Sequence, residues 1–137
     1  MESLHNLVGL MEIQYHHSRQ SLQQVINEET QIRRELTVLQ NHTHSARQLG
    51  LNDEPEMRAM GADILWERWL ERSRAKLNVE LARVLATKEM HITRVRRSFG
   101  KLQVANAKSN QVAQSEKKNT QVRNLDRAIW QTQLKNQ

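Results

Sequence analysis

Histidines are the side chains of this sequence whose chemistry most readily suggests a metal site. The chain has six of them, including the neighbours His16 and His17 and the pair His42 and His44. On a helix, adjacent residues diverge by about 100° and residues two apart do not face each other, so neither pair has the spacing of helical metal ligands. No third ligand accompanies either pair in the sequence. We therefore expect solvent-facing histidines, and neither a metal nor another cofactor.

Catalytic groups are equally poorly represented. The chain has no cysteine, which excludes thiolate metal ligands and cysteine nucleophiles. It has no glycine-rich loop suited to phosphates, and no Ser-His-Asp set can be assembled on the helices expected below. The sequence therefore predicts a protein that is not an enzyme and that has no small-molecule substrate.

A basic cluster, RVRRSFGK, could bind negatively charged partners through four side chains: Arg94, Arg96, Arg97 and Lys101. Guanidinium groups neutralise a nucleic-acid backbone without reading its sequence, but here no stacking aromatics are interleaved with them. Residues 62–137 carry 16 basic and 7 acidic side chains, whereas residues 1–50 carry 4 and 5. A solvated helix face and an acidic protein surface both fit this pattern, and nucleic acid is the less favoured alternative.

Two of the three tryptophans, Trp66 and Trp69, lie three residues apart in a chain that has one tyrosine and one phenylalanine. On a helix this spacing places both indoles within about 60° of each other. Both could close one end of a helical hairpin. Alternatively, the shoulder formed by Leu65 and Trp69 could anchor another protein, because tryptophan is frequent in binding hot spots. The residues allow both roles at once, with Trp66 inside and Trp69 outside.

The elements that must position these residues are helices. Hydrophobic residues make up 37% of the chain and aromatic residues 4%, which is too little to fill a large compact core. Residues that favour helices dominate, and the chain has one proline and four glycines. These properties predict an elongated, all-α protein.

A heptad pattern runs through the first third of the chain. Alternating steps of four and three from Leu4 to Ala46 reach 13 positions, of which ten are apolar. Such a strict repeat is typical of a coiled coil. Ser18, Glu29 and Thr43 interrupt this seam, and polar seam residues usually trade stability for register. The central apolar seam residues are Leu22, Val25, Ile32, Leu36 and Leu39.

A second apolar stripe follows the tryptophans, with a mean spacing of 3.6 rather than 3.5 residues, which predicts a straighter pairing. Its members are Trp66, Leu70, Ser73, Leu77, Leu81, Val84, Lys88, Ile92, Val95, Phe99 and Leu102. Gly50, Asn52, Asp53, Pro55 and Gly61 punctuate the stretch between the stripes and predict a turn.

Together these patterns predict a single domain, an elongated antiparallel two-helix coiled-coil hairpin with unequal arms. The first helix is expected at about 3–48, the turn at about 49–61 and the second helix at about 62–110. Residues 111–137 form a polar tail that we expect to fray or to await a partner. The N-terminal residues show neither a basic leader nor a continuous apolar run, so we expect no signal peptide and no membrane span.

This layout resembles the FliJ/YscO family of type III export proteins. The stretch GADILWERWLERSRAKLNVELARVLATKEMHITRVRRSFGK, residues 61–101, is similar to FliJ-like proteins from alphaproteobacterial flagellar clusters. The resemblance implies a cytoplasmic coiled coil, found also at the inner face of the cytoplasmic membrane. Its implied partners are the hexameric export ATPase, the export-gate protein and export chaperones.

The resemblance also implies a gate contact on one helix face just after the turn. Laid on this chain, that face consists of Trp66, Leu70, Ser73 and Leu77. Because these residues also belong to the expected seam, a gate contact would need the shoulder residues Leu65 and Trp69, or local opening. The ATPase contact would involve the end where both termini meet, and no individual residue can be matched there. The alternative, from another class of protein, is a helical scaffold or adaptor whose second helix completes a larger bundle from about residue 105.

Overall fold

The computed structural model describes residues 2–50 and 61–137, apart from the side chains of residues 49, 50, 62 and 63. Two helices account for nearly all of this part of the chain: α1 (Glu2–Gly50, 49 residues) and α3 (Ala62–Lys135, 74 residues), and no strand accompanies them there. The predicted all-α hairpin of two antiparallel helices with unequal arms is confirmed. Most of the expected turn, with Asn52, Asp53 and Pro55, lies outside the described residues.

The helix ends follow from local chemistry. Glu2 in the first turn of α1 and Arg47 in its last turn both suit the helix dipole. Gly61, just before α3, has a φ of 71°, in the left-handed region that residues with a Cβ rarely adopt. Its carbonyl accepts a hydrogen bond from the Leu65 amide at 3.2 Å, which closes the first turn of α3. Lys135 in the last turn complements the opposite pole of the dipole.

Helix α3 extends much further than the expected end near residue 110. Of the two expectations for residues 111–137, fraying or awaiting a partner, fraying is wrong, because the helix continues to Lys135. Glycine and proline are absent from residues 111–135, where glutamine, lysine, arginine and alanine favour a helix. Polarity of the side chains was therefore the wrong guide to where the helix ends.

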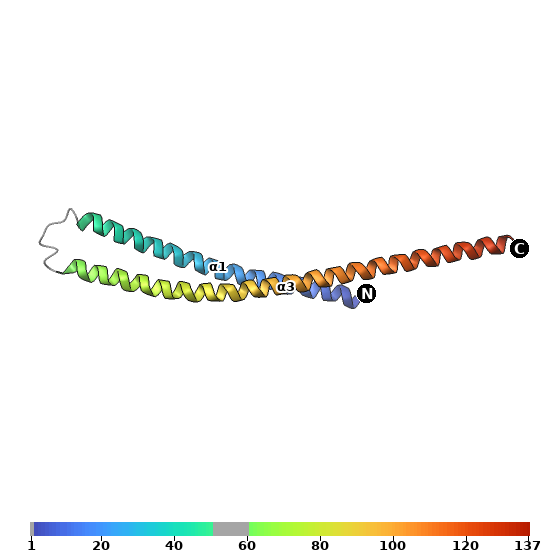
Figure 1. The fold of residues 1–137 in the computed structure, drawn as a ribbon, viewed down its shortest axis with the longest axis horizontal. Coiled ribbons are helices and arrows are strands. Elements are labelled where there is room, and N and C mark those ends of the chain that lie inside the picture. The colour runs from blue at the N-terminus through green and yellow to red at the C-terminus, as the bar shows by residue number, and fades with distance from the viewer. Residues whose placement is uncertain (1, 51–60) are drawn as a thin grey trace. The chain divides into compact units, whose positions relative to one another are not determined.

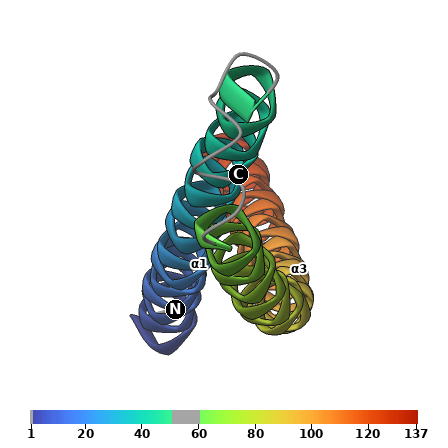
Figure 2. The same ribbon diagram turned by 90° about the vertical axis from the view of Figure 1, so that its left-hand side faces the viewer.

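The chain divides into two compact units, each built from a segment of both helices. A central unit comprises Arg19–Arg94, and a terminal unit comprises Met1–Ser18 with Val95–Gln137. In the central unit, Glu29 of α1 contacts Lys88 of α3, and Leu39 lines one hollow together with Leu77 and another together with Leu70. Residue numbers rise along α1 as they fall along α3, so the helices are antiparallel (Figures 1 and 2).

In the terminal unit, the two helices meet through small and aromatic side chains. The hydroxyls of Ser18 and Ser98 share a hydrogen bond of 2.9 Å, and the rings of Tyr15 and Phe99 lie 5.6 Å apart. Ala105 is buried on the same side of α3. From residue 113 onward every side chain of α3 is exposed, so this last segment has no described helix beside it.

The seam predicted in α1 coincides with its least exposed positions, because all 13 residues of the alternation from Leu4 to Ala46 are buried or half-buried. On α3 the 3.6-residue stripe is wrong at two positions: Trp66 is 44% exposed and Phe99 is 45% exposed. The buried and half-buried positions of α3 instead repeat every seven residues, at 70, 77, 84, 91, 98, 105 and 112. Two helices that supercoil around each other must share one 3.5-residue repeat, so Ser98 takes the place that its larger neighbour Phe99 was given.

Candidate interaction site

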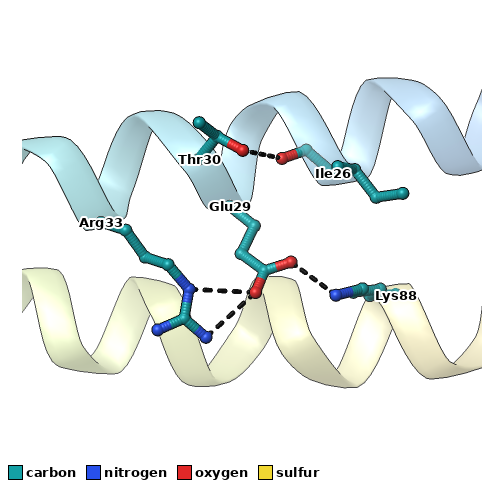
Figure 3. A network of polar contacts seen from close by, with 5 residues as sticks. All are labelled: Ile26, Glu29, Thr30, Arg33 and Lys88. Atoms are coloured by element: carbon teal, nitrogen blue, oxygen red, sulfur yellow. Dashed lines mark hydrogen bonds and ion pairs between the residues drawn. The ribbon is translucent and has the colours of Figure 1, made fainter.

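A polar layer interrupts the apolar interface of the central unit. Glu29 is 8% exposed and accepts hydrogen bonds from two cations (Figure 3). Lys88 Nζ lies 2.7 Å from Glu29 Oε2, and Arg33 Nε lies 3.0 Å from Oε1. The Lys88 ammonium and then the Arg33 guanidinium lower the pKa of the Glu29 carboxyl, against a smaller opposing effect of burial. The Glu29 carboxylate thus has two cationic partners, and the pair with Lys88 joins α1 to α3.

The Glu29 layer should give the stability of the protein a measurable dependence on pH. The pKa of Glu29 is lower in the folded state than its ordinary value of 4.5, so its stabilising effect is complete above about pH 4.5 and disappears as the pH falls through the folded pKa. We expect acidification from about pH 6 to about pH 3 to lower the thermal midpoint of the wild type more than that of Glu29→Gln. Thermal melts followed by circular dichroism test this, and parallel pH curves for the two proteins would contradict it.

The tryptophans form an exposed pair at the start of α3. The rings of Trp66 and Trp69 stack 5.1 Å apart at 18°, and the residues are 44% and 52% exposed. Leu65 is 67% exposed beside them. The interpretation that places Trp66 inside is therefore wrong, since Trp66 is exposed and its indole stacks on that of Trp69. Leu65, Trp66 and Trp69 form one apolar surface that extends outward.

The other three residues of the expected gate-contact face lie against helix α1. Leu70 is 5% exposed, and Ser73 and Leu77 are half-buried. They belong to the interface with α1, as the hollows that Leu70 and Leu77 line together with Leu39 indicate. The expected gate-contact face and its shoulder are thus divided between three exposed residues, Leu65, Trp66 and Trp69, and three residues that lie against α1.

The basic face is also divided. Arg94 belongs to the central unit, whereas Arg96, Arg97 and Lys101 belong to the terminal unit, where they are exposed. Phe99, the aromatic residue among them, packs against Tyr15 and is 45% exposed. This arrangement gives the terminal unit a cationic surface without a ladder of stacking rings.

The last segment of α3, residues 113–135, carries apolar side chains that contact no other described helix. Val122, Leu125 and Ile129 have the spacing i, i+3, i+7 of one helix face. All three are about half exposed or more, and Trp130 and Leu134 are each 67% exposed. The segment also carries five basic and two acidic residues. We call it the unpaired segment, and it combines apolar anchors with positive charge.

The side chains that the structure describes contain no cluster of three His, Asp or Glu residues that could hold a metal ion. No described helix combines the length and the apolarity that crossing a lipid bilayer requires. No protein-family model, curated protein or solved structure matches this chain.

Proposed function

We propose that this chain is a non-enzymatic helical docking protein that recruits an acidic helical partner through the unpaired segment. The observation that carries the proposal is that every residue of α3 from 113 to Lys135 is exposed, with Val122, Leu125 and Ile129 on one face. An amphipathic helix that packs on this face would bury those side chains, and its acidic flanks would meet the excess of basic residues.

In its more specific form, the proposal places the chain in a type III export apparatus, most naturally a flagellar one. The support is the resemblance in layout: a heptad-bearing first helix, aromatics just after the turn, and a longer basic second helix. The hairpin would dock between the export ATPase ring and the export gate, at the inner face of the cytoplasmic membrane, and export chaperones are further candidate partners. In a single copy of the chain, the exposed surface of Leu65, Trp66 and Trp69 would be available for the gate.

Binding to the export ATPase of the same organism tests this form of the proposal. We expect the two proteins to co-migrate on gel filtration and the rate of ATP hydrolysis to change, with both effects weakening as salt is raised. Val122→Glu in the unpaired segment should weaken the complex by about tenfold or more. Val79→Glu is the matched control, because Val79 is an equally exposed valine of α3 in the central unit, at 52% against 56%.

Two results would contradict the export assignment. One is the absence of any complex at low salt, and the other is normal export and swimming in a strain that lacks the gene. If the ATPase bound equally well to the Val122→Glu and Val79→Glu variants, the unpaired segment would not be the docking site.

A second candidate is a helical scaffold that completes a larger bundle with a different protein. The continuation of α3 to Lys135 favours it, because a helix that ends 23 residues after its last half-buried position, Val112, can lend a full helix face to a partner. Capture of an acidic helical protein that is unrelated to export, with loss of capture in Val122→Glu and not in Val79→Glu, would distinguish the scaffold from the export component.

A further inference from the structure

One side of the central unit has a continuous groove between α1 and α3. Its larger part, of about 490 Å³, has Val38, Leu39 and Leu77 as apolar lining, and its smaller part, of about 380 Å³, has Ile32 and Val84. Gln31 and Glu80 line both parts, so the two parts adjoin. Ser73 at the edge of the larger part is small, which leaves room beside Leu39. The groove is therefore apolar at its floor and open to a side chain from outside.

The stacked tryptophans lie in line with this groove. Steps of three and four residues from Trp66 lead through Trp69, Ser73, Lys76 and Glu80 along one row of α3, and the last three of these line the groove. Continuing the same steps leads to Met90, which is 55% exposed. Four of the seven large exposed apolar residues described in the central unit lie on this side: Val38, Trp66, Trp69 and Met90.

The central unit also buries few of its own side chains. Among its described residues only Val25, Leu70 and Glu29 are buried, and none of them is completely inaccessible. Stable helical domains normally pack two layers around one core, and the hairpin supplies a single layer (Figure 2). A second layer on the groove side would cover the apolar floor and the tryptophans together.

The charged rims of the groove indicate what that layer is. Glu28 and Glu35 give the α1 rim its acidic residues, with Arg34 between them, and Lys76 and Arg83 give the α3 rim its basic residues, with Glu80 between them. The order of signs on one rim is the inverse of the order on the other. If two copies pack this side together about a twofold axis along the helices, α1 of each copy lies over α3 of the other. Acidic rim then meets basic rim in both halves of the contact.

From this self-complementarity we infer that the groove side of the central unit is a homodimer interface, in which two hairpins form a four-helix arrangement. This interface is distinct from the unpaired segment, so it can form whether or not that segment binds a partner. The second copy buries Val38 and the stacked tryptophans of the first.

Measurement of the molar mass of the full chain from low to high micromolar concentration tests the inference. We expect a mass of twice 16.1 kDa at the upper end, from light scattering or sedimentation velocity. Val38→Glu should weaken dimerisation by about tenfold or more, because it places a charge in the contact. Val79→Glu should leave it unchanged, since Val79 has the same 52% exposure but lines neither part of the groove.

Charge reversal supplies a second test that loss of folding cannot imitate. Arg83→Glu should weaken the dimer, and adding Glu28→Arg should restore much of its affinity, because the cross-copy pair is re-formed with its signs exchanged. Circular dichroism confirms that each variant remains helical. A monomer at every concentration, equal weakening by Val38→Glu and Val79→Glu, or a dimer that dissociates only in Val122→Glu would each overturn the inference. The first result would exclude a dimer, and the other two would place the dimer contact elsewhere. None of the three tests whether the chain binds the export ATPase.

Discussion

Val25→Asp is expected to remove most of the cooperative helical structure of the central unit. Val25 is 6% exposed, one of the few buried apolar side chains of the described chain, and it lies one helical turn from Glu29. A carboxylate placed at this buried position would lose its hydration, and Lys88, on the facing helix, already contacts Glu29 at 2.7 Å. Burial of an unpaired charge costs about 3 kcal/mol or more, a large part of the stability of a small domain.

Urea unfolding followed by circular dichroism measures this effect. Val79→Asp makes the same change of side chain on a helix of the same unit, at a residue that is 52% exposed, and it should cost less than about 1 kcal/mol. If the two variants unfold at the same urea concentration, the interface between α1 and α3 does not hold the fold together where we place it.

The pair Glu29 and Lys88 should show a large non-additivity. Glu29→Leu leaves the Lys88 ammonium in the interface without its carboxylate, and Lys88→Leu leaves Glu29 with Arg33 alone. We expect each single variant to melt below the wild type. The double variant should melt at or above the wild-type temperature, because two leucines restore an apolar layer.

The same double variant tests what the polar layer contributes. Without Glu29 and Lys88 nothing in this layer opposes a shift of one heptad between the helices, so we expect the gain in melting temperature to be accompanied by a less uniform pairing. Cysteine pairs placed at Ser18 and Ser98, whose hydroxyls are 2.9 Å apart, report that register through disulfide formation. Additive effects of the two leucines would show that the ion pair does not couple the helices.

The sequence was sufficient to predict that there are two long helices and that they pair, because both depend on local patterns. The alternation from Leu4 to Ala46 identifies the face of α1 that lies against α3, since a coiled coil has one repeat and most of this seam is apolar. The pairing of Glu29 with Lys88 could also have been predicted. Both interrupt an apolar stripe, they carry opposite charges, and an antiparallel hairpin with a turn near residue 55 brings them to the same level.

Three features could not be obtained from hydrophobicity alone. Phe99 is apolar but stands beside the seam, because the repeat of α3 is set by its partner helix, and that repeat passes through Ser98. Trp66 is also apolar, which favours a place in the buried stripe, but it is 44% exposed and its indole stacks on Trp69. The predicted end of α3 is too early, because residues 111–135 still favour a helix although they are no longer buried. The groove is lined by residues of both helices, so the apolar stripe of one helix alone could not predict it.

Scarcity of burial has a thermodynamic consequence. No described side chain is fully inaccessible to solvent, although two long helices supply a full set of backbone hydrogen bonds. The heat capacity increment of unfolding follows newly hydrated apolar area, and for globular proteins it is about 12–15 cal/mol/K per residue. A single hairpin of this kind should fall below that range, which flattens its stability curve. Cooling would then alter its free energy of unfolding little, and association that buries the exposed apolar side would restore the usual curvature.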